Sequence, residues 1–163
     1  MEFTVSTSIA RPREEVFEYL ADVANHAEFT DHYRVDWHLL REDSYGLGAG
    51  ARFRVKAPLN RFSWADTTIA ELVPPYRIVE HGRGGKFNRI RRLGVYTLSP
   101  GPGGTTKVEY SLETDPRLPS DRLMDTLGGA RSARRQAAKS LRRLRSVLEE
   151  GRDRGRRPSV AAR

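Results

Sequence analysis

STSIARPREEVFEYLADVANHAEF, residues 6–29, joins the end of an alternating strand to two short helices. Residues 3–9 alternate between the two faces with the period of two that is typical of a β-strand. Pro12 fits the first turn of a helix, where its missing N–H costs nothing, and the helix dipole favours the two glutamates that follow. Residues 22–29 predict a second short helix.

Strand patterns separated by turns then occupy most of the next eighty residues. In residues 51–57, Phe53 and Val55 face one way and three basic side chains face the other. One wet face and one dry face indicate an antiparallel sheet. The predicted strands after the short helices cover residues 33–41, 51–57, 62–73, 76–81, 87–98 and 107–113.

A long helix is predicted to begin at Ser120 and to end at Gly151. Its Leu and Ala residues recur at three- and four-residue spacing and form one apolar stripe. The apolar face of a sheet of about seven strands must pack against another element, and this helix carries the only long apolar stripe. The sequence therefore predicts an α+β fold, with a curved antiparallel sheet wrapped around the C-terminal helix.

Composition excludes several kinds of site. The 163 residues suit one domain and contain no Cys, so no disulfide or Cys-ligated metal is expected. The four histidines are not spaced like metal ligands, and the sequence has no P-loop and no nucleophile-elbow motif. No metal and no cofactor is predicted, and the catalytic residues of an enzyme stay unknown from these motifs. Without a signal peptide or a long apolar run, a cytoplasmic protein is the default expectation.

The net charge of +8 is unevenly distributed. Residues 1–116 hold 15 Lys and Arg against 16 Asp and Glu, whereas residues 117–163 hold 14 against 5. A basic arm for nucleic acid or an anionic membrane is one interpretation; a solvated helix face with a frayed end is the other. Aromatic residues are absent from 117–163, which disfavours base stacking there. Residues 151–163 are predicted to form a disordered basic tail.

Four stretches, IARPREEVFEYLAD, GLGAGARFRV, AELVPPYRIVEH and GGTTKVEYSLETDP, resemble the START-like helix-grip superfamily when taken with the order of elements. More narrowly, the chain is similar to the bacterial polyketide cyclase/dehydrase and lipid-transport group, over about residues 1–150. The resemblance implies a helix-grip fold with an elongated, mainly apolar cavity between the sheet and the long helix.

Arg134 is the most specific candidate for a polar ligand contact, because helical spacing places it within the apolar stripe. A buried guanidinium needs a partner, which is either a ligand anion or an internal carboxylate such as Asp66 or Glu71. Gly128 and the glycine after it, early in the same helix, indicate either a hinge or a kink.

Aromatic and polar side chains on the strands are the other candidates for the cavity wall, where core and ligand-contact roles overlap. The predicted ligand-binding residues are Arg134, Tyr96, Tyr110, Trp64, Phe53 and His81. His81 is also a possible acid or base.

Three functions remain open at this point. The first is binding of a small hydrophobic molecule, such as a lipid, an isoprenoid or an aromatic polyketide. The second is a polyketide cyclase or aromatase that works without metal or cofactor. The third, which is not favoured, is an interaction module that uses the basic helix on nucleic acid or an anionic membrane.

Overall fold

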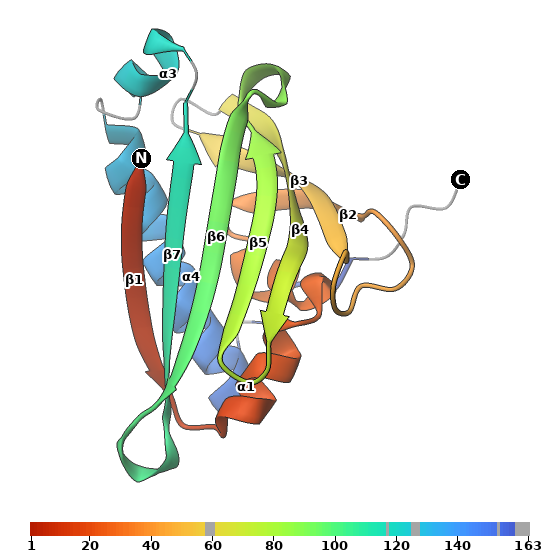
Figure 1. Cartoon of the computed structure of the whole chain (residues 1–163), viewed down its shortest axis with the longest axis vertical. Helices are drawn as coiled ribbons and strands as arrows, with labels where there is room; N and C mark the ends of the chain where they lie inside the picture. The colour runs from red at the N-terminus through yellow and green to blue at the C-terminus, as the bar shows by residue number, and fades with distance from the viewer. Residues whose placement is uncertain (58–60, 117, 125–127, 153, 159–163) are drawn as a thin grey trace.

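The computed structural model describes residues 1–57, 61–116, 118–124, 128–152 and 154–158. Its framework is one seven-stranded antiparallel sheet with the order β1-β7-β6-β5-β4-β3-β2, which curls around a helix (Figure 1). This confirms the predicted fold class. The strands are β1 (Glu2–Ile9), β2 (Arg34–Leu39), β3 (Gly50–Ala57), β4 (Arg61–Val73), β5 (Arg77–Gly84), β6 (Ile90–Pro100) and β7 (Thr106–Asp115).

The short helices follow β1, as predicted. Pro12 lies one residue before the first helix rather than inside it, and its carbonyl accepts from the N–H of Val16. In the described part of the chain, no helix is long and apolar enough to cross a membrane. The helices are α1 (Arg13–Leu20), η1 (Val23–Asn25), α2 (His26–Thr30), η2 (Lys86–Asn88), η3 (Pro102–Gly104), α3 (Pro119–Met124) and α4 (Ala130–Glu150).

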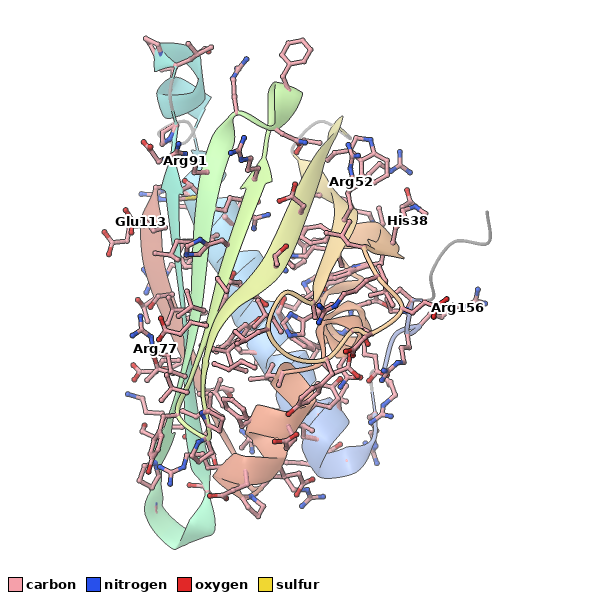
Figure 2. The ribbon with its side chains drawn as sticks, turned by 45° about the vertical axis from the view of Figure 1, so that its right-hand side comes forward. His38, Arg52, Arg77, Arg91, Glu113 and Arg156 are labelled. Atoms are coloured by element: carbon pink, nitrogen blue, oxygen red, sulfur yellow. The ribbon has the colours of Figure 1, made fainter. Side chains whose placement is uncertain are left out.

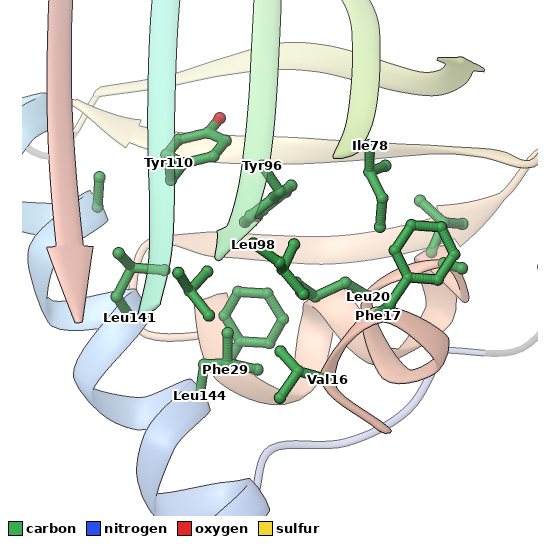
Figure 3. Packing of buried hydrophobic residues seen from close by; sticks show 14 of the residues in the cluster. Val16, Phe17, Leu20, Phe29, Ile78, Tyr96, Leu98, Tyr110, Leu141 and Leu144 are labelled. Carbon is green, nitrogen blue, oxygen red and sulfur yellow. The ribbon is translucent and has the colours of Figure 1, made fainter. Parts of the chain in front are cut away.

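The apolar core lies between the concave face of the sheet, the two short helices and the second half of α4 (Figure 3). Leu141 and Leu144 of α4 are buried there in one cluster with Phe17, Leu20 and Phe29. Each large side chain buried in this way contributes about 1.5–3 kcal/mol to stability. The core therefore anchors α4 through its C-terminal half.

The predicted single helix from Ser120 onwards is two helices in the structure. Gly128 has a φ of +108°, a backbone conformation that L residues rarely adopt, and α4 begins two residues later. The positive φ of Gly128 marks an irregular backbone just before α4, and a hinge role for the glycines stays a prediction. Leu127, a predicted member of the stripe, lies outside the described residues.

The chain after α4 turns back onto the short helices. Arg154 Nε lies 3.3 Å from Glu28 Oε2, and the N–H of Gly155 donates to the carbonyl of Glu28 at 2.8 Å. Arg157 donates to Asp22 Oδ2 at 2.6 Å. Residues 154–158, here called the C-terminal strap, thus place two arginines beside Glu28 of α2 and Asp22, the residue before η1, and the disordered tail stays a prediction. The domain boundary at residue 150 stays a prediction.

Candidate functional site

Polar side chains meet inside the fold, where the curled sheet faces α2. They come from six different elements and bring hydrogen-bonding and charged groups into a largely apolar interior. We call this set the inner polar cluster. Its members, all buried, are His26 of α2, Arg34 of β2, Thr67 of β4, Glu80 of β5, Tyr96 of β6 and Tyr110 of β7.

The sheet register explains why these side chains face inward. Arg34 pairs with Val55 of β3, two residues from the buried Phe53, so it shares the inner face. Glu80 pairs with Ile69 of β4, next to a register shift in that strand. Glu80 also pairs regularly with Gly94 of β6 and lies two residues from the buried Ile78, so it shares the inner face with Ile78.

His26 and Glu80 form the centre of the cluster. The imidazole Nε2 lies 2.7 Å from the carbonyl oxygen of Leu20, and because a carbonyl only accepts, Nε2 carries a proton. The other ring nitrogen, Nδ1, lies 3.1 Å from Glu80 Oε1. Thr67 donates its hydroxyl to the other carboxylate oxygen at 3.3 Å. The carboxylate thus accepts from Thr67, while its Oε1 and His26 Nδ1 lie close together without a hydrogen bond between them among the described residues.

Arg34 supplies a buried positive charge with incomplete hydrogen bonding. Only 3% of the residue is exposed, and its Nε has no hydrogen-bond partner among the described residues. The guanidinium carbon lies 4.9 Å from the ring centre of Phe53 and 5.2 Å from that of Tyr33. Cation–π contacts favour the charge but accept no hydrogen bond. The remaining donor capacity is therefore open to another group.

The two tyrosines complete the wall opposite α2. The ring centres of Tyr96 and Tyr110 lie 4.6 Å apart, and Tyr96 meets His26 edge-on at 5.7 Å. Burial, and then the charge of Glu80, raise the pKa of Tyr96 above its ordinary value. Burial likewise raises the pKa of Tyr110. Both phenols are therefore neutral at physiological pH and act as O–H donors.

Glu80 is ionised in spite of its burial. Burial alone would raise its pKa, but His26, Arg34 and the Thr67 hydroxyl together lower the pKa below its ordinary value. A buried carboxylate with this set of partners is a stable anion near neutral pH. It balances part of the positive charge that Arg34 brings into the interior.

The space beside the cluster is small. A cavity of about 10 Å³ lies within the sheet's concave side, which is the room of a single water molecule. The elongated cavity implied by the resemblance is thus filled by side chains at this point. The cavity is lined by Arg34, Phe53, Asp66, Thr67, Glu80, Gly82, Arg92, Gly94, Tyr110 and Leu112.

The interior is less tightly covered toward the first half of α4. Inward positions that are buried near the short helices become half-buried at this end of the sheet. The half-buried inward residues are Val55, Ser63, Ile90, Arg92 and Ala133.

Three of the six predicted ligand-binding residues meet at this place. Phe53, Tyr96 and Tyr110 are all buried in the interior, although their contact with a ligand stays a prediction. Arg134 was expected within the apolar stripe, but it is exposed. Arg134 lies in the first half of α4, which is less buried than the second half. Even the neighbouring inward residue Ala133 is only half-buried there, so Arg134 at the edge of the stripe is in solvent.

Trp64 and His81 lie on the outer face of the sheet. Trp64 alternates with the buried Ala65 and stacks against Arg52, whose guanidinium carbon is 4.8 Å from its ring centre. Arg52 and His38 mark this outer side in Figure 2. His81 lines a separate groove of about 690 Å³ on the outer face. This placement does not support contact of Trp64 or His81 with a ligand inside the fold.

Sequence reasoning missed four members of the cluster, His26, Arg34, Thr67 and Glu80. The only available signal was a charged residue that directly follows apolar strand residues, as Glu80 follows Ile78 and Val79. Arg34 opens a strand, where a basic residue looks like an ordinary surface position. Among the described residues, no group of three or more His, Asp or Glu side chains is placed to hold a metal ion.

Comparison with known proteins identifies the family of the chain. Residues 1–149 match the family model described as polyketide cyclase/dehydrase and lipid transport. The chain belongs to this family. The match spans the polyketide cyclase/dehydrase and lipid transport domain from β1 almost to the end of α4, and it confirms the resemblance seen in the sequence. No curated protein matches the chain.

Solved structures share the fold at low sequence identity. The KanY protein aligns with a TM-score of 0.74 and 13% identity, covering 91% of this chain and 97% of that one. TTHA0849 from Thermus thermophilus gives 0.69 and 14%, with 90% and 95% covered. DR_A0006 from Deinococcus radiodurans gives 0.61 and 19%, with 93% and 99% covered. At these identities the similarity shows the family's fold alone.

Proposed function

We propose that this protein binds a small hydrophobic molecule, such as a lipid, an isoprenoid or an aromatic polyketide, between the sheet and α4. The observation that carries the proposal is the buried Arg34, whose Nε lacks a hydrogen-bond partner among the described residues. A buried polar group without a partner costs about 1–3 kcal/mol, and more when it is charged. A ligand oxygen at this position removes that cost.

The family supports the same proposal, because its description includes lipid transport. The ligand's apolar part would lie toward the first half of α4, where the inward side chains are half-buried. Its polar end would reach Arg34 and Tyr110. Because the cavity there has the volume of one water molecule, side chains along this path must move when the ligand enters.

A cyclase or dehydrase activity is the second candidate. It is favoured by the His26–Glu80 pair, which places an acid–base couple beside a tyrosine hydroxyl in a water-poor interior. Such chemistry needs a positioned chain and one or two proton-transfer groups. The metal-free mechanism and the cytoplasmic location both stay predictions.

Native mass spectrometry of protein purified from a heterologous host tests the first proposal. We expect a retained mass that denaturing extraction releases as a lipid or an aromatic compound. An empty protein whose melting temperature is unmoved by fatty acids, isoprenoids and aromatic polyketides would contradict the proposal. Cyclisation of a poly-β-ketone thioester, lost in Glu80→Gln, would instead favour the enzyme.

A further inference from the structure

The charges of the inner polar cluster do not balance when each group has its usual hydrogen bonds. Arg34 is protonated at any accessible pH and brings one positive charge. His26 keeps a proton on Nε2, because the Leu20 carbonyl 2.7 Å away can only accept. One further proton can be present or absent. It would lie on His26 Nδ1, on Glu80 Oε1 or between these two atoms, which are 3.1 Å apart.

Without that proton, Glu80 balances only one of the two cations beside it, Arg34 and Arg92, and the lone pair of Nδ1 faces a carboxylate oxygen at 3.1 Å. This arrangement is repulsive. With the proton, the His26–Glu80 pair is attractive and neutral as a unit. The charge of Arg34 is then left unbalanced in an interior where isolated charges are costly. Neither state of the cluster alone satisfies all three groups.

An anion beside Arg34 removes this conflict. It balances the guanidinium, accepts from the Nε that has no partner among the described residues, and leaves Glu80 free to share a proton with His26. The cavity of about 10 Å³ has room for one oxygen atom of such a group without rearrangement. A guanidinium is also well matched to planar anions such as carboxylate and enolate.

We propose that the ligand of this cluster is an organic anion, whose oxygen is held by Arg34, and that its binding takes up one proton at the His26–Glu80 pair. The inference rests on the proposed binding function and specifies its ligand class. The groups that face the pair are Arg34 and Tyr33 at the start of β2, Thr67 of β4, Arg92 and Tyr96 of β6, and Tyr110 of β7. Asp66 also lines the cavity, but its carboxylate accepts from the backbone N–H of Arg83 at 2.7 Å, so the pair is the place for the proton.

Calorimetric titration with two probes of equal chain length tests the proposal. Dodecanoate carries a charge and 1-dodecanol does not. We expect dodecanoate to bind at least about tenfold more tightly, the equivalent of about 1.4 kcal/mol. Its affinity should rise as the pH falls, with a limiting slope of about tenfold per pH unit, because the bound state holds one more proton. The affinity for dodecanol should not change with pH.

Proton uptake is measured directly by repeating the dodecanoate titration in two buffers with different ionisation enthalpies. Arg34→Met should abolish the preference for dodecanoate, whereas Arg77→Met, at an exposed arginine of β5, should leave it unchanged. Glu80→Gln should keep the preference and lose the proton uptake. If Arg34→Met does not fold, Arg34→Lys keeps the charge and should retain a weakened preference.

The outcomes separate the two proposals. Equal binding of both probes, unchanged in the Arg34 variants, would overturn the anion inference and leave the binding function intact. Preference for dodecanoate without proton uptake would overturn the coupling alone. Failure of both probes to bind, together with an empty protein by native mass spectrometry, would overturn the binding function itself.

Discussion

Gly94 lies directly beneath the hydroxyl of Tyr110, and a β-carbon at that position would come within 3.1 Å of the hydroxyl oxygen. The same β-carbon would lie 3.3 Å from Glu80 Oε2. Gly94 pairs with Glu80 on one side and with Leu112 on the other. The absence of a side chain therefore lets the carboxylate and the phenol approach one another over the backbone of β6.

Gly94→Ala should consequently destabilise the protein. The added methyl group meets two buried polar atoms, and overpacking of this kind costs about 1–3 kcal/mol. Chemical denaturation would measure the change in the free energy of unfolding. Thr97→Ala, at an exposed position of the same strand, is the control and should stay within about 0.5 kcal/mol of the unmodified protein. An equal effect of both substitutions would contradict the contact.

A double-mutant cycle should show that Arg34 and Glu80 stabilise one another. Glu80→Gln removes the charge that faces a buried guanidinium, which is strongly destabilising in comparable pairs at about 3–5 kcal/mol. Adding Arg34→Met should recover part of that loss, because the uncompensated charge is then gone. We expect a coupling free energy of about 0.5–3 kcal/mol from equilibrium unfolding of the four proteins. Strict additivity would show that the two groups do not interact.

His32 should make stability depend on pH. Burial, Arg143 and Lys139 lower its pKa from 6.5 to about 4. The unfolded chain therefore binds a proton more readily, so this contribution is intact above pH 6.5 and is lost as the pH falls toward 4. The free energy of unfolding, measured across this range, should change more steeply with pH in the unmodified protein than in His32→Gln. His38→Gln, at an exposed site of β2, should leave the pH dependence unchanged.

The C-terminal strap should add a small, salt-sensitive stabilisation. Arg157 donates to Asp22 at 2.6 Å and to Asn25 at 2.8 Å, so Arg157→Ala should lower stability by about 1 kcal/mol, the upper end for partly exposed pairs. The neighbouring Arg156 is exposed, and Arg156→Ala should have no effect. Thermal melts at low and high salt would compare the two. A salt-independent loss in both would argue against the ion pairs.

Alternation along the strands was sufficient to predict the sheet and much of the core. Phe53, Tyr96 and Tyr110 were placed on the inner face because their neighbours at two-residue spacing are apolar, and the structure buries all three. The two short helices were predictable for a similar local reason. Each depends on a start signal and a few apolar residues within ten positions.

The centre of the candidate site was not predictable in this way. Glu80 is in phase with the buried Ile78, but Val79 between them is buried as well, and nothing in this short stretch marks a charged residue as buried. Trp64 was misplaced because small residues such as Ala65 occupy the inner positions of its strand. These outcomes depend on pairing between strands, which no single stretch of sequence contains.

The position of β1 also has a consequence for how the chain folds. Strands β2 to β7 pair with their sequence neighbours, so this part of the sheet can grow hairpin by hairpin. β1 instead pairs with β7, joining Glu2 to Glu113, and it also packs against α4. The first strand made on the ribosome therefore finds its partners last. This high contact order predicts folding on the millisecond-to-second scale, limited by closure of the N-terminal edge.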